Sequence, residues 1–266
     1  MLTRMDGLLR IKRDVTSVGP EIFGNFYGVP ITNSFLMSML IIFLIILFAI
    51  FFIPRLKEMP SKTQNMVEAV YEAVIGLIAQ ITGNETWAKR VFPLVASLLV
   101  YIGIANLIGL IPGLTSITFN EAPLLRTPTS DFNTTVGLAL GVVLVIQIAS
   151  ISDWGFWGYL GRFFKFKEVY LGFKQGFGAG AMAIVEFLIG LLDIFAEFAK
   201  VISLSFRLFG NMFAGEVLAL LILGAFAYVI PSAWLAMNLL FAIVQAVVFG
   251  ALAAAYYTLA LKPLED

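Results

Sequence analysis

The sequence contains no cysteine and no histidine among its 266 residues. These absences exclude disulfide frameworks, thiolate chemistry, imidazole metal sites and histidine-based catalytic triads. No GxxxxGK[ST] sequence occurs either, so a loop that holds nucleotide phosphates is not expected. The stretch GFGAG at 176–180 echoes a dinucleotide-binding motif, but it lacks a preceding strand and is interpreted as a flexible entry into a helix. We therefore expect no cofactor, no metal site and no catalytic site in this chain.

Charged residues are also scarce. They make up 13% of the chain, whereas hydrophobic residues make up 60% and the mean hydropathy is +0.96. This is far more apolar than an average soluble domain. The formal net charge is zero, and the basic residues do not gather into a block that would bind nucleic acid. The composition indicates an integral membrane protein that contacts lipids and has no nucleic acid as a partner.

Long apolar runs give the number of membrane spans. A bilayer core about 30 Å thick requires roughly 20 apolar residues of helix, and three runs fit directly, at about 34–53, 91–112 and 132–152. From about 182 to 222 the chain stays apolar over a length of roughly 60 Å as a helix, twice the bilayer core. Either FGN at 209–211 is a turn between two ordinary spans, or one helix crosses at a steep tilt. With a last span at about 232–261, the single tilted helix gives five spans in an all-α protein.

Two further stretches are amphipathic. Residues 61–83 carry apolar side chains at helical spacing on one side and charged side chains elsewhere, and residues 153–174 mix aromatic rings with four basic side chains. Such patterns are typical of helices that lie at the headgroup boundary. We expect both stretches to form helices on the membrane surface.

The orientation follows from the basic residues in the connections. Lysine and arginine concentrate after the first and third spans, while Arg126 is the sole basic residue after the second. The positive-inside rule therefore places the first and third connections in the cytoplasm. We expect residues 1–33 to be extracytoplasmic and 34–266 to form one membrane domain with a cytoplasmic C-terminus, although four basic residues within 1–33 favour the opposite orientation.

The fourth apolar run carries a stripe of charge. Four residues follow one another at intervals of seven, which keeps them on one helix face, and Asn211 extends the stripe by one turn. The structural interpretation is that Lys200 pairs with Glu197 or Asp193 near water, and for these residues it stands equal to a functional one. The four residues of the stripe are Glu186, Asp193, Lys200 and Arg207.

Arg207 differs from the rest because it lies near the middle of the apolar region. A charge there costs roughly 2.5–3.5 kcal/mol on insertion scales, which favours a functional role. Glu216 lies nine residues beyond, about 180° around and about 13 Å along an unbroken helix, so it does not neutralise Arg207 there. In the last span, Asn238 and Gln245 are seven residues apart and share a face, as neutral groups that hydrogen-bond between helices.

Four stretches together resemble subunit a of the F-type ATP synthases. The most specific is SLSFRLFGNMFAGE at 203–216, and it is supported by NLIGLIP at 106–112, PTSDFNTT at 128–135 and NLLFAIVQA at 238–246. The resemblance covers most of the chain. It implies a non-catalytic, ion-translocating stator subunit in the bacterial plasma membrane, beside a ring of c subunits. Its partners would be that ring, b-type peripheral stalk subunits and the rest of the synthase.

The resemblance also implies roles for single residues. Arg207 would be the essential arginine that faces the carboxylates of the ring, Gln245 would face it, and Asp193 would lie on the cytoplasmic access path. Glu216 and Asn238 would lie on the outer path, offset from the first. The further candidates for the ion pathway are Asn211, Asn106, Asp131, Ser203, Lys200 and Glu197.

The family favours the single tilted helix, here 183–222, paired with 232–261 in a hairpin curved against the ring. The transported ion, H⁺ or Na⁺, stays open, because its ligands should reside mainly on the c subunit. Many members carry an ionisable partner of the glutamate at the position of Asn238, and this chain departs from that pattern. We also expect Ser205 and Asn211 to flank Arg207 on the side that faces the ring.

Two other classes of protein fit the sequence less well. A secondary transporter with a midplane substrate site usually shows internal repeats, and none is found in this sequence. A passive assembly scaffold does not explain a central arginine such as Arg207.

Overall fold

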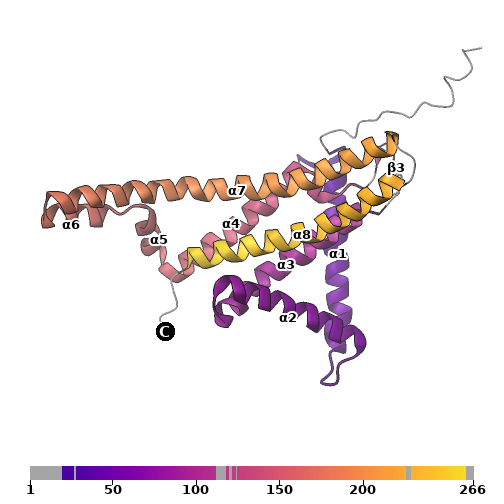
Figure 1. Ribbon diagram of the computed structural model, residues 1–266, viewed down its shortest axis with the longest axis horizontal. Coiled ribbons are helices and arrows are strands. Elements are labelled where there is room, and N and C mark those ends of the chain that lie inside the picture. Colours follow the sequence, from indigo (N-terminus) through magenta and orange to yellow (C-terminus); the bar gives the residue numbers. More distant parts are fainter. Residues whose placement is uncertain are drawn as a thin grey trace, which may run out of the picture. The chain divides into compact units, whose positions relative to one another are not determined.

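The computed structural model describes residues 20–26, 28–111, 118–119, 122–123, 125–225 and 229–261. Most of the predicted N-terminal segment and the charged residues after 261 lie outside these ranges. The elements, labelled as in Figure 1, are the strands β1 (Ile22–Phe26), β2 (Val29–Thr32), β3 (Thr118–Phe119) and β4 (Ala122–Pro123), the short 3-10 helices η1 (Ile53–Arg55) and η3 (Pro128–Ser130), and the helices α1 (Asn33–Phe52), α2 (Lys62–Thr82), α3 (Glu85–Gly109), α4 (Phe132–Trp154), α5 (Phe156–Phe163), α6 (Phe166–Gln175), α7 (Phe177–Ala225) and α8 (Val229–Ala260).

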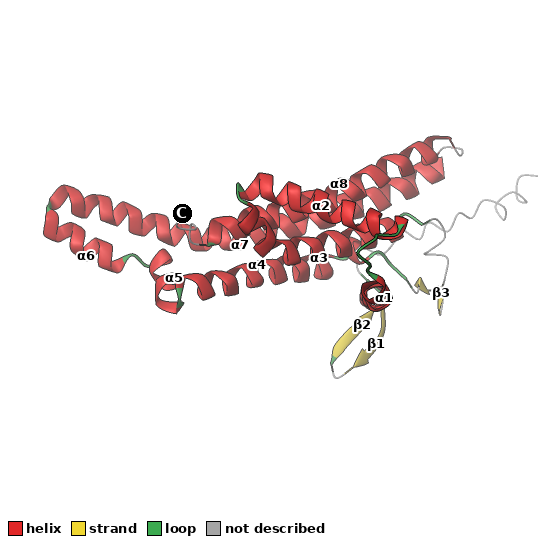
Figure 2. Ribbon diagram, turned by 90° about the horizontal axis from the view of Figure 1, so that it is seen from below, coloured by secondary structure: helices red, strands yellow, loops and turns green. Residues whose placement is uncertain are grey.

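Among the described residues, five helices are long and apolar enough to cross a membrane, which confirms the predicted number. They are α1 with η1, α3, α4, the stretch Phe177–Ala219 of α7, and Ile230–Ala260 of α8. In the part of the chain that the structure describes, the strands form two antiparallel pairs, β1 with β2 and β3 with β4, and Figure 2 shows the first of these leading into α1. The protein is therefore an all-α membrane protein, as expected.

Helix α3 starts earlier than the predicted residue 91. Its first turn is capped by Asn84, whose side-chain oxygen accepts a hydrogen bond from the backbone N–H of Thr86 at 2.7 Å. Trp87 and Ala88 are then buried at 7% and 0% exposure. The hydropathy pattern marked only the apolar part of this helix, whereas the cap and the buried first turn set its true start.

Helix α7 answers the question left open by the sequence. It runs unbroken for 49 residues from Phe177 to Ala225, so FGN at 209–211 forms no turn. Figure 1 shows it as one continuous ribbon. At 1.5 Å per residue its length is about 74 Å, more than twice a bilayer core. The single long helix favoured by the family is confirmed, and its tilt in a membrane stays a prediction.

The two amphipathic stretches also form helices. Helix α2 begins after Ser61, whose hydroxyl accepts a hydrogen bond from the backbone N–H of Gln64, and ends at Gly83 in the left-handed conformation, φ 74°. The second stretch forms two short helices, α5 and α6, rather than one. Trp157 is 82% exposed and Phe166 64%, as expected for side chains that lie in lipid headgroups.

The chain forms two compact units. The first consists of Met1–Leu56, Val100–Thr135 and Leu208–Val247, and the second of Lys57–Leu99, Val136–Arg207 and Val248–Asp266. The predicted single membrane domain over 34–266 stays a prediction.

In the first unit, α1 packs against α3. Met37, Ile41 and Ala105 are buried together, with five partly buried apolar side chains around them. The hydroxyl of Tyr101 hydrogen-bonds to that of Ser38 at 3.0 Å beside this cluster.

In the second unit, the end of α8 is held by α4 and α5. The carbonyl oxygen of Ala260 accepts hydrogen bonds from Ser150 at 2.9 Å, from the indole of Trp154 at 3.2 Å and from Arg162 at 3.2 Å. Arg90 of α3 and Asp153 of α4 also form an ion pair. The three hydrogen bonds to Ala260 satisfy the last carbonyl of α8, which has no partner within its own helix.

Candidate ion pathway

In the first unit, polar side chains join α7 to α8. The amide of Asn211 donates to Oε1 of Gln245 at 2.6 Å. One turn further along α7, the carbonyl oxygen of Gly215 accepts from the indole of Trp234 at 3.3 Å and from Nδ2 of Asn238 at 3.4 Å. Gly215 permits this approach, because a Cβ there would lie 3.2 Å from Oδ1 of Asn238. The predicted shared face of Asn238 and Gln245 therefore turns toward α7.

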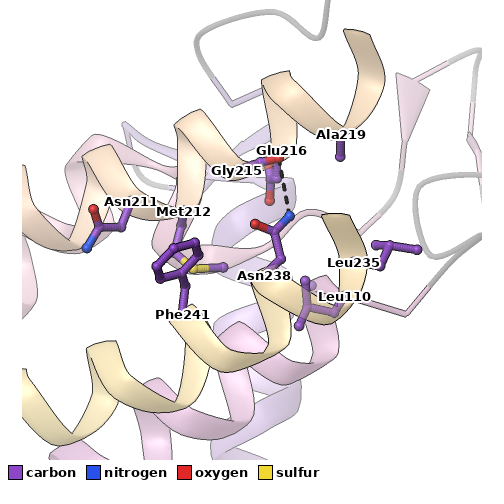
Figure 3. Close-up of a pocket in the computed structure, with 10 residues that line it drawn as sticks. Leu110, Asn211, Met212, Gly215, Glu216, Ala219, Leu235, Asn238 and Phe241 are labelled. Carbon is purple, nitrogen blue, oxygen red and sulfur yellow. Dashed lines mark hydrogen bonds between the residues drawn. The ribbon is translucent and has the colours of Figure 1, made fainter. Parts of the chain in front are cut away.

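A cavity of about 60 Å³ lies beside these contacts (Figure 3). Three polar side chains line it, those of Asn211, Glu216 and Asn238, and the remaining lining is apolar or glycine. A buried water needs about 10–15 Å³ of such space and two to four polar partners, so the cavity has room for several waters. Within the first unit, the structure thus brings together three of the predicted pathway residues around one small, hydratable space.

The carboxyl group of Glu216 has neighbours from a different segment. The side chains of Thr127 and Ser130, from η3 and the residue before it, and the charged group of Arg126 lie close enough to influence it. Arg126, Thr127 and Ser130 are buried at 5%, 4% and 0% exposure. Glu216 itself is half-buried.

Two predicted pathway residues have hydrogen bonds that fix the fold. Oδ1 of Asn106 accepts from the hydroxyl of Thr129 at 2.7 Å, and its Nδ2 donates to the carbonyl of Ala242 at 3.4 Å. Asp131 is 3% exposed and accepts from the backbone N–H of Asn133 at 3.0 Å, at the start of α4. Both residues therefore link or cap helices, and their place on an ion pathway stays a prediction.

In the second unit, Arg207 is half-buried and donates to the hydroxyl of Ser203, one turn earlier on α7, at 3.4 Å. Within the part of the chain that the structure describes, no carboxylate forms an ion pair with it. A neutral hydroxyl at that distance does not compensate a guanidinium charge in an apolar region. Arg207 and Asn211 lie four residues apart on one helix, which places them on one face.

The other charges of the stripe are partly neutralised. Lys200 pairs with Glu197 at 2.6 Å, the first of the two predicted partners, and Gln147 donates to the second oxygen of Glu197 at 2.7 Å. The hydroxyl of Tyr159 donates in turn to Oε1 of Gln147 at 2.9 Å. Asp193 is half-buried.

The hydroxyl of Tyr159 is a donor at neutral pH, as a phenol with its ordinary pKa already is, and it holds the amide of Gln147 toward Glu197. Burial raises the pKa of this phenol, the charge of Glu197 raises it further, and Arg162 opposes the shift.

One sequence-based expectation is wrong. Ser205 was expected on the exposed side beside Arg207, yet it is buried at 1% exposure. Two residues correspond to about 200° around a helix, so Ser205 points away from the face of Arg207. Asn211, at a spacing of four, is exposed as expected.

The sequence patterns did not reveal several polar groups that lie near Glu216 or Glu197 in the structure. Arg126 and Thr127 stand just before the PTSDFNTT stretch, and nothing in their spacing relates them to Glu216 on α7. Gln147 and Tyr159 were missed for the same reason. Among the residues that the structure describes, no group of three or more histidine, cysteine, aspartate or glutamate side chains is arranged to hold a metal ion.

Comparison with known proteins agrees with these observations. The family model described as ATP synthase A chain matches residues 35–258. The chain is 33% identical over 243 residues to "ATP synthase subunit a, sodium ion specific" of Propionigenium modestum, covering 89% of this chain and 76% of the relative. It is 35% identical to ATP synthase subunit a of Desulforamulus reducens over 74% of this chain and 66% of the relative, and 29% identical to that of Moorella thermoacetica over 91% and 96%.

The matched region covers all five spanning helices apart from the first two residues of α1 and the last two of α8, and it includes Arg207 and Glu216 of α7. The chain therefore belongs to the ATP synthase subunit a family, the ion-translocating stator subunits of F-type ATP synthases.

Proposed function

We propose that this chain couples ion flow to rotation of a c-ring through Arg207, between two offset half-channels. The observation that carries the proposal is the environment of Arg207. It lies within an unbroken spanning helix, and no carboxylate in the described part of the chain pairs with it. An intramembrane guanidinium is costly, and it is retained where it performs a function.

A carboxylate on each ring subunit is the partner that fits this arginine. Such a carboxylate crosses a lipid face only when a bound ion neutralises it. Because a guanidinium does not lose its proton in a protein, it draws the arriving carboxylate into its charged form, and the ion is released. It also blocks direct leakage between the half-channels, so loading on one side and unloading on the other require the ring to turn.

The two polar clusters supply the access paths. Glu216 with Asn238, beside the hydratable cavity, forms the outer path. Asp193, with Glu197, Lys200 and Ser203 nearby on α7, forms the cytoplasmic path. Asn211, hydrogen-bonded to Gln245, lies between Arg207 and Glu216 along α7, and Gln245 faces the arginine as the family resemblance implies.

The remaining parts of the proposal concern partners and location. The chain assembles with the c-ring, b-type stalk subunits and the rest of the synthase in a bacterial plasma membrane, with residues 1–33 outside and the C-terminus in the cytoplasm. The soluble part of the synthase holds the nucleotide sites. One relative is named as sodium ion specific. The transported ion is therefore H⁺ or Na⁺, and uptake assays with and without Na⁺ distinguish the two.

Replacing Arg207 tests the proposal. Arg207→Ala should leave assembly intact but abolish ATP synthesis driven by an ion gradient, because the ring carboxylate loses its counter-charge. Arg207→Lys should not restore the parent rate, since an ammonium lacks the fork of five donors and loses its proton when buried. The assay is ATP synthesis and ATP-driven ion uptake in vesicles, with and without Na⁺, and immunoblots that check the complex.

Arg55→Ala is the matched control, because Arg55 is exposed at the end of η1. Normal coupled synthesis by Arg207→Ala would contradict the proposal. Copurification separates the rivals, since a secondary transporter with a midplane site would purify without a proteolipid ring and without a soluble ATPase.

A further inference from the structure

Gln147 lies within the spanning helix α4, and the proposed mechanism gives it no task. Both ends of its amide are used: Nε2 donates to Oε2 of Glu197 on α7 at 2.7 Å, and Oε1 accepts from the hydroxyl of Tyr159 on α5 at 2.9 Å. The amide has one favourable orientation, because exchanging its oxygen and nitrogen would place an oxygen against the carboxylate. Gln147 therefore presents a donor to Glu197, and Tyr159 keeps it turned that way.

The carboxylate of Glu197 is thereby held at both oxygens. Its Oε1 accepts from the ammonium of Lys200 at 2.6 Å, while Oε2 accepts from the amide of Gln147. The ammonium of Lys200 also lies 5.2 Å from the centre of the Tyr256 ring on α8, within the range of a cation–π interaction. Within the second unit, three other helices thus contribute to fixing one ion pair of α7.

The ion pair lies on the sheltered side of α7. The side chains of Glu197 and Lys200 are 14% and 18% exposed, whereas Phe195 and Phe198, on the opposite side of the same helix, are 71% and 66% exposed. Two charges withdrawn from water are tolerated only where they compensate each other. A change that removes the charge of Glu197 would therefore leave an uncompensated ammonium on the polar side of α7.

The charge of Lys200 matters because of its place in the stripe. Lys200 lies seven residues from Asp193 and seven from Arg207, so all three residues share one side of α7. Among the residues that the structure describes, no cation pairs with Asp193, so its carboxylate can attract a cation. An uncompensated ammonium on the same side would repel that cation, and charges that line a narrow path change the local ion concentration by roughly 10- to 1,000-fold.

We infer that Gln147 and Tyr159 are positioning residues, which hold Glu197 against Lys200 so that the lysine charge is cancelled and Asp193 is left to accept the ion. The inference rests on the proposed cytoplasmic path along α7. Neither Gln147 nor Tyr159 touches the transported ion. Glu197 does not accept it either, because both of its oxygens are occupied.

Variants of the ion pair test the charge argument. Glu197→Gln should lower ATP-driven ion uptake about tenfold in vesicles that hold the complete synthase, because it leaves the ammonium of Lys200 uncompensated. The double variant Glu197→Gln/Lys200→Met should recover most of that uptake, since the repelling charge is gone. Parent-like uptake by Glu197→Gln, or no recovery in the double variant, would overturn the inference when immunoblots show assembled complexes.

The positioning role is tested in two backgrounds. Gln147→Leu, and Tyr159→Phe as a milder change that keeps the ring, should each lower uptake about threefold in the parent, the effect of one lost hydrogen bond between membrane helices. Neither change should lower uptake further in the Glu197→Gln/Lys200→Met background, because no ion pair is left to position. A merely structural role in joining the helices would lower uptake equally in both backgrounds, and that result would overturn the inference.

Two further variants complete the experiment. Tyr170→Phe is the matched control, because Tyr170 lies on α6 and is 64% exposed, and its uptake should equal that of the parent. If Arg207→Ala abolishes coupling while Gln147→Leu lowers uptake equally in both backgrounds, the proposed function stands and the role of Gln147 falls. Normal coupling by Arg207→Ala would overturn the proposed function and, with it, this inference.

Discussion

Replacing the buried Gln245 by leucine should change the stability of the complex little and its ion flow strongly. Gln245 is 4% exposed, and its Oε1 accepts from Asn211 at 2.6 Å. Its Nε2 is buried and has no hydrogen-bond partner among the described residues. A buried amide that uses its acceptor but not its donor is a feature that stability alone does not explain.

The expected change in stability is small. Losing the bond to Asn211 removes about 0.6 kcal/mol, and at most about 1.7 kcal/mol, by comparison with hydrogen bonds between membrane helices. Removing the unpartnered donor relieves about 1–3 kcal/mol of desolvation. The Gln245→Leu variant should therefore lie between about 1 kcal/mol less stable and about 2 kcal/mol more stable than the parent.

The expected change in ion flow is large. Nε2 of Gln245 is expected to donate to the arriving ring carboxylate, directly or through water in the pathway. Replacing Gln245 by leucine then removes one hydrogen bond to a charged group, worth about 1.5–3 kcal/mol. That corresponds to roughly 10- to 150-fold in rate. The assay is ATP-driven ion uptake in vesicles beside thermal inactivation of the purified complex, with Gln80→Leu on the exposed side of α2 as control. Parent-like uptake by a stable Gln245→Leu complex would refute the reasoning, and so would loss of uptake that only follows loss of the complex.

Two further predictions concern the second unit. Gly190→Val should reduce the thermal stability of the complex by roughly 1–3 kcal/mol, because a Cβ at Gly190 overlaps the carbonyl oxygen of Phe163 in α5. Gly178→Val is the control and should be tolerated, because a Cβ at Gly178 meets nothing within 4 Å. Equal losses of stability in the two variants would contradict the packing argument. Lys200→Met should destabilise by about 1–3 kcal/mol, because it leaves the carboxylate of Glu197, 14% exposed, without its cation. The double variant Lys200→Met/Glu197→Gln should recover most of that loss in the same thermal assay, and a further decrease would show that the pair is not coupled.

Features encoded along a single helix could be predicted from the sequence. The apolar runs placed the spans, although only the structure excluded the turn at FGN that would have divided α7, and Glu197 was one of the two partners expected for Lys200. Spacing by seven placed Asn238 and Gln245 on one face, and both side chains hydrogen-bond to α7. These predictions succeed because helical periodicity fixes which side chains lie together, whatever the rest of the chain does.

Contacts between distant segments could not be predicted in this way. The segment before α4 lies near Glu216 although some 90 residues separate them in the sequence, and no periodicity relates residues on different elements. Motif stretches also do not distinguish an ion-path residue from a structural one. Asn106 lies in such a stretch, and in the structure its amide joins α8 and η3 through hydrogen bonds.

The helical separation of Arg207 and Glu216 keeps the two charges from neutralising each other. Nine residues along α7 correspond to about 13 Å and half a turn, where two unit charges attract by about 1.3 kcal/mol at an effective dielectric constant of 20. The glutamate therefore competes only weakly for Arg207. Arg207 then keeps its charge for a carboxylate on another subunit, which is the condition that coupling ion flow to rotation requires.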